Sequence, residues 1–406
     1  MNRKVTLLYI SLACVLSLQA QTRQQMGGVY YAYPEGPSAK TGTFGTATYV
    51  MSDSLSVPQG YAPFYISHYG RHGSRWMPKD DRYVWICKHF EDESNLTPLG
   101  LQVKGMLQRV WENARGNGGK LSKLGALQHQ GIAHRMFERY PQIFAVGNAV
   151  KARSSVVDRC AKSMQAFTSE LYSLQPGLNL DVKTDSADMA WIAYVSPEVK
   201  ALENRTHVQA QVSPRRFLLQ LFKDVSKVNE PLKLMTEMHT VASSIQDVGL
   251  NFSSYPQDIE DGLNALFTDD EFRAIYEANN LRMAINNGTV ATNEDIPARS
   301  AISLWQNIEA EADRALRSVK SSATLRFGHD TALYRLLSLL FDVNVPPAGA
   351  REEASLVVLG DEMEKMDRVV PMAANLQMIF YKNAKDSVLV KFMLNERDIM
   401  LSPVGR

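Results

Sequence analysis

Long apolar runs, cysteines and a surplus of charge of one sign are all scarce in this sequence of 406 residues. Beyond the N-terminus, no segment approaches the roughly 18 apolar residues that a membrane-spanning helix needs, so we expect no membrane span. A net charge of +1 argues against a nucleic-acid binder, because such proteins show a strong basic bias. A local basic pocket for an anionic small molecule stays compatible with this balance.

The signatures of metal and nucleotide sites are also missing. The sequence has three cysteines, none at a Cys/His spacing typical of zinc, and no Gly-rich string ends in Lys-Ser or Lys-Thr as a P-loop does. We therefore expect no metal and no other cofactor. Cys87 and Cys160 could form a disulfide or could be two buried thiols that pack as small hydrophobes, and the sequence leaves both interpretations open.

Residues 1–20 have the pattern of a signal peptide. Arg3 and Lys4 give a basic start, residues 5–18 are nearly all apolar or small, and Ala20 offers a small residue for cleavage. This pattern predicts a protein that is exported to the periplasm or secreted. Anchoring as a lipoprotein through Cys14 is the less favoured alternative, because the residues before it match a lipoprotein signal poorly.

Three strand–loop–helix units predict an α/β fold with a mainly parallel sheet flanked by helices. The strands are expected at 64–69, 149–153 and 324–327, and each runs into a polar loop that precedes a helix. The helix of the second unit is expected to start with a capping box formed by Ser155 and Asp158. Since ligands gather at the carboxyl ends of parallel strands, the three loops should lie together.

Residues 181–319 differ from the rest of the chain because strand patterns become rare and helical stretches follow one another. We interpret this part as a mostly helical domain inserted into an α/β catalytic domain formed by 25–180 and 320–406. Further expected elements are helices at 214–225, 232–248, 268–285 and 300–319, strands at 355–359, 376–381 and 387–394, and a loop-like stretch at 41–60.

The string Arg71-His72-Gly73-Ser74-Arg75, followed by Pro78, carries the most chemical information. Guanidinium groups offer planar sets of donors that match phosphate oxygens. An imidazole between fixed cations loses its proton more easily, which leaves a ring nitrogen able to attack phosphorus. Taken alone, the string is also compatible with an Arg-rich loop around a hydrogen-bonded histidine.

This string, together with the distant Gly328-His329-Asp330, resembles the histidine acid phosphatase branch of the histidine phosphatase superfamily. The segment Asp158-Arg159-Cys160 resembles the one that carries a third phosphate-binding arginine in that family. Residues 370–375 resemble a segment of multiple inositol polyphosphate phosphatases. One departure is that two residues separate Arg75 from Pro78, where many members have one. The resemblance implies a phosphoglycerate-mutase-like fold.

The resemblance also implies roles for six residues. His72 would be the nucleophile that becomes a phosphohistidine, and Asp330 would protonate the leaving alcohol. The phosphate oxygens would be held by Arg71, Arg75, Arg159 and His329. Phosphoryl transfer needs these residue types, because it depends on several fixed cations and on an acid beside the leaving alkoxide. Taken alone, Arg159 could equally be a surface cation.

These observations predict an exported phosphomonoesterase that acts on a small-molecule phosphomonoester. The expected substrate is an inositol polyphosphate such as phytate. Asp330 stands where inositol phosphatases of the His-Ala-Glu type have glutamate, so a sugar-phosphate or broad-specificity acid phosphatase is the alternative. A second alternative is a non-catalytic phosphate-binding protein. Basic residues of the insert could meet further phosphates or could form a solvated face: Lys200, Arg205, Arg215 and Arg216.

Overall fold

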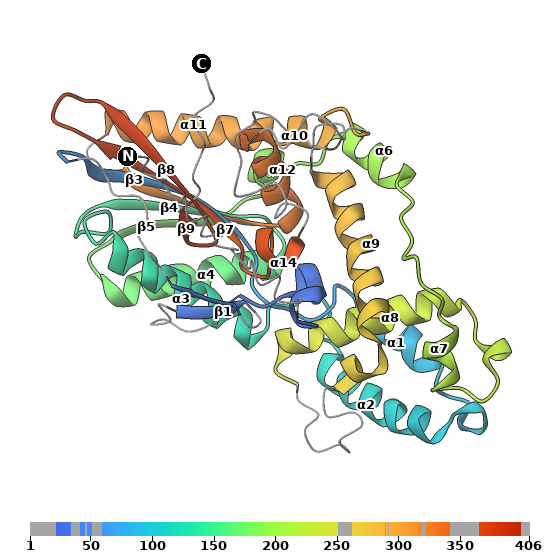
Figure 1. Ribbon diagram of the computed structural model, residues 1–406. Helices are drawn as coiled ribbons and strands as arrows, with labels where there is room; N and C mark the ends of the chain where they lie inside the picture. The colour runs from blue at the N-terminus through green and yellow to red at the C-terminus, as the bar shows by residue number, and fades with distance from the viewer. Residues whose placement is uncertain are drawn as a thin grey trace, which may run out of the picture.

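A seven-stranded mixed sheet forms the centre of the molecule (Figure 1). The computed structural model describes residues 22–33, 41–44, 47–50, 59–250, 262–288, 290, 292–318, 321–341 and 365–398. The strand order is β5-β4-β6-β3-β7-β8-β9. The first four strands in this order are parallel: β5 (Asn179–Thr184), β4 (Ala149–Ser154), β6 (Ser321–Gly328) and β3 (Ala62–Arg71).

The other edge of the sheet is antiparallel. β7 (Asn375–Lys382) pairs antiparallel with β3, and β8 (Val388–Leu394) returns beside β7 after a turn at 384–385. The short β9 (Arg397–Asp398) completes this edge. The α/β fold with parallel strands at its centre is therefore confirmed, and the C-terminal strands make the sheet mixed.

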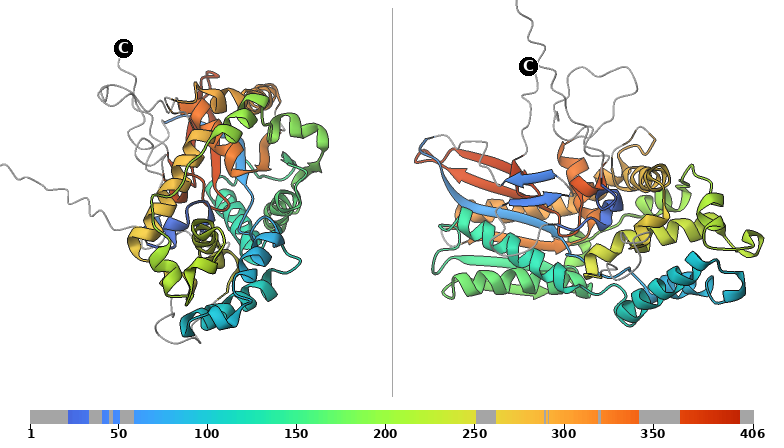
Figure 2. Two further views of the ribbon diagram at one scale, coloured as in Figure 1. Left: turned by 90° about the vertical axis from the view of Figure 1, so that its right-hand side faces the viewer. Right: turned by 60° about the horizontal axis from the view of Figure 1, so that its bottom comes forward.

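Helices cover both faces of the sheet (Figure 2). On one face, α3 (Lys123–Arg139) and α4 (Asp158–Leu174) pack their apolar residues against Ile66, Val150 and Leu325. On the other face, α11 (Ile302–Arg317), α12 (Asp330–Phe341) and α14 (Met366–Val369) pack against Leu376 and Met378. Successive side chains of a strand point to opposite faces, and the central strands β3 and β7 are buried on both faces along most of their length.

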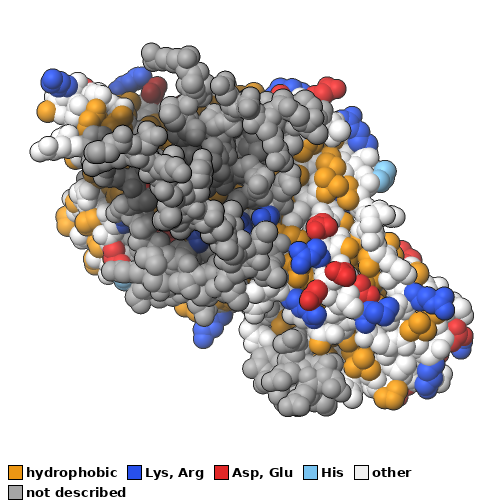
Figure 3. Space-filling view, in the orientation of Figure 1, with side chains coloured by type: hydrophobic (Ala, Val, Ile, Leu, Met, Phe, Trp, Pro, Cys, Tyr) orange, Lys and Arg blue, Asp and Glu red, His pale blue; other side chains and the backbone are white. Residues whose placement is uncertain are grey.

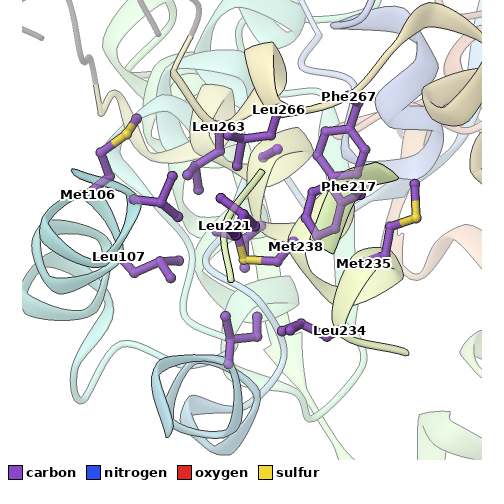
Figure 4. Packing of buried hydrophobic residues seen from close by; sticks show 14 of the residues in the cluster. Met106, Leu107, Phe217, Leu221, Leu234, Met235, Met238, Leu263, Leu266 and Phe267 are labelled. Carbon is purple, nitrogen blue, oxygen red and sulfur yellow. The ribbon is translucent and has the colours of Figure 1, made fainter. Parts of the chain in front are cut away.

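A second hydrophobic core lies beside the sheet (Figures 1 and 4). It is formed by α1 (Asp80–Lys88), α2 (Pro98–Ala114), α7 (Arg215–Leu219), α8 (Pro231–Ser244) and α9 (Asp269–Asn287). Thus α1 and α2, which precede the predicted insert, share a core with its helices, whereas α11 packs on the sheet. The division of the chain into two domains stays a prediction, and this packing indicates that 80–114 would belong with the helices.

The remaining elements are short. They are η1 (Gln25–Tyr30), β1 (Thr41–Phe44), β2 (Ala47–Val50), η2 (Glu93–Asn95), η3 (Ser186–Asp188), α5 (Met189–Ile192), α6 (Pro197–Arg205), η4 (Val225–Lys227), η5 (Ile245–Val248), η7 (Gly262–Leu266) and α10 (Ile296–Ser300). β1 and β2 form an antiparallel pair, so the loop-like interpretation of 41–60 was wrong for these residues.

The start of α4 differs from the one that the sequence predicts. The capping box was wrong, because α4 begins at Asp158 behind Val157 without a side-chain cap, and the Ser155 hydroxyl instead contacts the imidazole of His329. The strand expected at 355–359 and the signal sequence at 1–20 lie outside the described residues. Among the described helices, none is long and apolar enough to span a membrane.

Candidate active site

The register of the parallel strands brings the three predicted loops together. Arg71, the last residue of β3, lies beside Gly328, the last residue of β6, and Ser154 of β4 lies beside Phe327. The loops that carry His72, Arg159 and His329 therefore start at one edge of the sheet, as the sequence predicts. This convergence follows directly from parallel pairing, because parallel strands end on the same side.

Backbone hydrogen bonds fix His72 from both sides. Its N–H donates to the carbonyl of Gly328 (3.0 Å), and its carbonyl accepts from the N–H of Ala373 (3.0 Å). Ala373 has a positive φ of 61°, which is uncommon for a residue with a side chain. The histidine is thus held between the end of β6 and the segment that leads into β7.

Gly73 is required by packing against α3. A Cβ on this residue would lie 2.4 Å from the carbonyl oxygen of Gly125, which no side chain could accommodate. Its backbone N–H donates to Oγ of Ser163 on α4 (3.1 Å). The glycine therefore lets the loop lie directly on the N-terminal turn of α3, a role that sequence reasoning did not foresee.

The protonation of His72 is set by its surroundings. Nδ1 lies 2.9 Å from the carbonyl oxygen of Gly73, and because a carbonyl only accepts, Nδ1 carries the proton and Nε2 keeps its lone pair. Burial, followed by the charges of Arg71, Arg75 and Arg159, lowers the pKa of His72 well below its ordinary value. The ring is therefore neutral and its Nε2 is a competent nucleophile at neutral and mildly acidic pH.

Arg71 is fully buried and held by the protein itself. Nη1 donates to the carbonyls of Val29 (2.7 Å) and Val370 (2.6 Å), while Nη2 lies 3.0 Å from Oδ2 of Asp330. Its Nε has no hydrogen-bond partner among the described residues. The guanidinium is thus fixed in position while part of its donor set remains available.

Arg75 and Arg159 also present unused donors. Nη1 of Arg75 donates to the carbonyl of Trp76 (2.8 Å), and its guanidinium lies over the ring of Tyr30 at 5.4 Å from the centroid. Within the described part of the chain, Nε of Arg75 and Nε of Arg159 are buried without a partner. Buried N–H groups are normally paired, so these donors indicate a site for an anion.

His329 and Asp330 lie where β6 passes into α12. The ring of His329 is 5.8 Å from that of His72, and its Nε2 is 3.2 Å from the Ser155 hydroxyl. Burial lowers the pKa of His329 to about 4. The burial of Asp330 acts to raise its pKa, but the neighbouring charges, with that of Arg71 first, hold it below the usual range. The site thus combines three guanidiniums, two neutral imidazoles and one carboxylate, and its surplus of positive charge attracts anions.

Three residues that sequence reasoning missed support the loop. Ser74 donates from its hydroxyl to Oδ1 of Asp247 on η5 (2.6 Å) and from its N–H to Oε1 of Gln128 on α3 (2.8 Å). Burial raises the pKa of Asp247 to about 8. No motif in the sequence pointed to these contacts, which join residues 173 and 54 positions apart. They tie the loop to α3, which covers the sheet, and to η5, which follows α8.

The basic residues of the insert and the two cysteines can also be placed in the structure. Arg216 is paired with Glu271, so it serves the packing of α7 on α9, while Lys200, Arg205 and Arg215 lie on the surface. Cys87 and Cys160 are free thiols. In the described ranges, no three histidine, cysteine or acidic side chains are grouped as a metal site would require.

Comparisons with known proteins identify the family of this chain. The sequence profile of the histidine phosphatase superfamily (branch 2) matches residues 70–395, and the chain belongs to this family. Multiple inositol polyphosphate phosphatase 1 of Gallus gallus is 23% identical over 298 residues, which are 69% of this chain and 64% of that protein. The chain thus matches a little under two thirds of the length of this relative.

Solved structures show the same fold. Multiple inositol polyphosphate phosphatase of Bifidobacterium longum, in complex with inositol hexasulfate, superposes with a TM-score of 0.67 at 15% identity and 93% coverage of both chains. The phytase of D. castellii superposes with a TM-score of 0.64 at 13% identity, covering 96% of this chain and 83% of that one.

Proposed function

We propose that the protein is a phosphomonoesterase that forms a phosphohistidine at His72. The observation that carries the proposal is a buried, neutral imidazole with Nε2 unprotonated among three guanidiniums, two of which have unpaired buried Nε donors. Membership of the histidine phosphatase superfamily supports the same assignment. A site that only bound phosphate would need neither a nucleophile nor an acid, which disfavours the non-catalytic alternative.

In the first step, Nε2 of His72 forms a bond to phosphorus as the bond to the ester oxygen breaks. Arg71, Arg75, Arg159 and His329 would contact the non-bridging oxygens and stabilise the transition state. Asp330 would give its proton to the departing alkoxide. In the second step, a water molecule attacks phosphorus, Asp330 accepts its proton, and inorganic phosphate leaves the regenerated imidazole.

The low pKa of Asp330 fits this cycle when the charge of the substrate is included. Without an anion, the guanidinium of Arg71 at 3.0 Å favours the carboxylate. A bound phosphate ester adds negative charge beside the same guanidiniums, which raises the pKa of Asp330 and favours the protonated form. Asp330 would therefore take up the proton that it later donates when the substrate binds.

For the substrate, we propose inositol polyphosphates of the phytate type. The similarity to the Gallus gallus protein supports this choice. Specificity would come from the helices packed around α8 and α9, within the proposed insert at 181–319. Sugar phosphates are the alternative, because the acid here is Asp330 in a Gly-His-Asp string.

A substrate panel tests the proposal. Values of kcat/KM for phytate, glucose 1-phosphate and p-nitrophenyl phosphate should rank phytate first. Glucose 1-phosphate in first place would favour the alternative, and no turnover of any of the three would remove the catalytic assignment. Trapping of radiolabelled phosphate on the wild-type protein, and its loss in His72→Ala, would identify the covalent intermediate.

We also propose that the protein is exported to the periplasm or secreted, on the pattern of residues 1–20. Expression of the full chain, followed by N-terminal sequencing of the protein from the periplasmic and culture fractions, tests this. Cleavage near Ala20 is the expected result. An intact N-terminus on protein retained in the cytoplasm would contradict it, and a lipid-modified Cys14 would favour the anchored form.

A further inference from the structure

Ser155 follows the last residue of β4, and its side chain contacts His329 rather than the helix that comes after it. The residue is fully buried. Its N–H donates to the carbonyl of Phe327 (3.0 Å), which fixes its backbone to the end of β6. Its hydroxyl oxygen lies 3.2 Å from Nε2 of His329. The hydroxyl that the sequence predicts as a helix cap therefore belongs to the surroundings of the site.

Cys160 of α4 contacts the same imidazole. Its Sγ donates to the carbonyl of Gly328 (3.2 Å) and lies 3.8 Å from Nε2 and 4.0 Å from Nδ1 of His329. Because a thiol has a single proton, the sulfur has none to give to the ring. The Ser155 hydroxyl also interacts with this sulfur, but sulfur is a weak acceptor, so the ring nitrogen is the better partner for the hydroxyl proton.

The ring of His329 belongs to the phosphate site. It is 5.8 Å from the ring of His72. Burial lowers the pKa of His329 to about 4, so at neutral pH the ring has one proton only. Which of the two nitrogens carries this proton decides whether the ring can donate to an anion. Four charged groups of the site act on the ring: Asp330, Arg159, Arg71 and Arg75.

The contact with Ser155 indicates which nitrogen carries the proton. A ring nitrogen that contacts a phosphate oxygen must be protonated, because that oxygen is an acceptor. Nε2 is engaged by Ser155, so Nδ1 is the nitrogen that remains for the anion. With its one proton on Nδ1, the ring needs a donor at Nε2, and a hydroxyl can rotate to donate. In the opposite form, the lone pair of Nδ1 would repel the anion.

We propose that Ser155 is a positioning residue of the phosphate site. Its hydroxyl donates to Nε2 of His329 and thereby selects the form of the ring in which Nδ1–H is available to the phosphate. This inference rests on the proposed function, because it assumes that His329 contacts a phosphate oxygen. Ser155 would act on the phosphate through His329 alone.

The contribution of Ser155 should depend on pH. An imidazolium carries a proton on both nitrogens, so no selection between two forms is needed once His329 is protonated. Loss of the hydroxyl should therefore weaken anion binding at neutral pH and matter less as the pH falls to about 4. The other groups around the ring are unchanged by a substitution of Ser155: Tyr69, Arg71, His72, Arg75, Arg159, Cys160 and Asp330.

Isothermal titration calorimetry on the full-length protein tests this inference, with inorganic sulfate as the probe. Sulfate has only acceptor oxygens and, unlike phosphate, keeps its charge between pH 7 and about pH 4. Ser155→Ala should bind sulfate about tenfold more weakly than wild type at pH 7, and the two affinities should converge toward about pH 4. Ser173→Ala, the same change at an exposed position of α4, should bind as wild type does at both pH values.

Equal binding by Ser155→Ala and wild type at neutral pH would overturn the inference and leave the proposed function intact. A loss of the same size at both pH values would also overturn it, because a purely structural role would not depend on the protonation of His329. If wild type binds neither sulfate nor inorganic phosphate, the phosphate site itself is wrong and both proposals fail.

A second measurement does not depend on the folding of Ser155→Ala. In wild type with isotope-labelled histidine, NMR spectra that correlate ring nitrogens with ring protons show which nitrogen carries the proton. The signals of His329 are assigned by their absence from the spectrum of His329→Gln. We expect a protonated Nδ1 in the sulfate complex at neutral pH, and a protonated Nε2 would overturn the inference.

Discussion

Buried arginines occur in two regions of this molecule, and their surroundings differ. On α3, Arg135 forms a two-point contact with Glu396, with Nε to Oε1 at 2.9 Å and Nη2 to Oε2 at 2.7 Å, and both side chains are at most 1% exposed. At the ends of the parallel strands, Arg75 and Arg159 have unpaired Nε donors among the described residues.

The difference separates structural from functional cations. A carboxylate that satisfies a buried guanidinium makes the pair part of the fold. Guanidiniums without such partners repel one another and destabilise the protein in its free state. A bound anion compensates their charge and removes this cost. On the part of the surface coloured in Figure 3, basic and acidic side chains are intermixed.

The largest effect should come from the nucleophile. His72→Ala should lower kcat for p-nitrophenyl phosphate by roughly 10⁴-fold or more, because it removes the proposed acceptor of the phosphoryl group. Steady-state kinetics measures this. Retained turnover would show that His72 is not the nucleophile. If turnover is lost, an unchanged melting temperature would show that the variant is still folded.

The second largest effect should come from Asp330, the proposed acid. Asp330→Asn should slow the phosphorylation of His72 by about 10²–10⁴-fold for alkyl phosphates, whose leaving groups need a proton. Nitrophenolate leaves without help, so p-nitrophenyl phosphate should be affected less. Single-turnover rates for both substrates give the comparison. Equal slowing of the two would remove Asp330 from the acid role.

The two arginine regions can be compared directly with matched substitutions. Arg159→Gln should lower kcat/KM by about 10²–10³-fold with little change in stability, because it removes a charge that lacks a carboxylate partner. Arg135→Gln should cost about 3–5 kcal/mol of unfolding free energy, because it leaves the Glu396 carboxylate buried without its cation, with the Tyr33 hydroxyl still donating to it.

Chemical denaturation and enzyme kinetics on the same samples show whether each variant loses stability or activity. The contrast fails if Arg159→Gln destabilises the fold as much as Arg135→Gln does. It also fails if Arg135→Gln folds normally but loses activity as Arg159→Gln does.

Asp247 should give the smallest effect, visible through pH. Its folded pKa of about 8 exceeds that of the unfolded chain, so folding takes up a proton between roughly pH 4 and 8. This contribution to stability is present at low pH and is lost as the pH rises through this window. Asp247→Asn keeps an acceptor for Ser74 and carries no charge.

The stability of Asp247→Asn relative to wild type should therefore increase from pH 5 to pH 6.5, on the order of 2 kcal/mol. Urea unfolding at both pH values measures it. Asp247→Ala, which leaves the Ser74 hydroxyl without its acceptor, should be destabilised at both pH values. A difference between the Asn variant and wild type that does not vary with pH would show that Asp247 is not protonated by folding.

Local patterns in the sequence were enough to locate the site. The strands at β3, β4 and β6 are marked by runs of strand-forming residues, and parallel pairing then places His72, Arg159 and His329 at one edge. The roles of these residues stay predictions. The helix expected after the third strand is α12, and its Leu333, Leu336 and Leu337 are buried.

What could not be predicted depends on packing between distant segments. The Ser74–Asp247 contact spans 173 positions, and no local pattern marks a protonated carboxyl group. The Ser155–Asp158 capping box failed for a similar reason, because the Ser155 hydroxyl contacts His329, which is 174 positions away. The shared core of α1 and α2 with α8 likewise needed the three-dimensional structure.

The two carbonyls that hold Arg71 come from near both ends of the described chain, at Val29 and at Val370, the latter 299 positions beyond the arginine. The phosphate site can therefore form only after synthesis has reached the last strands. Such distant contacts also slow folding. A nascent chain that ends before Val370 would lack one of the two carbonyls that hold Arg71.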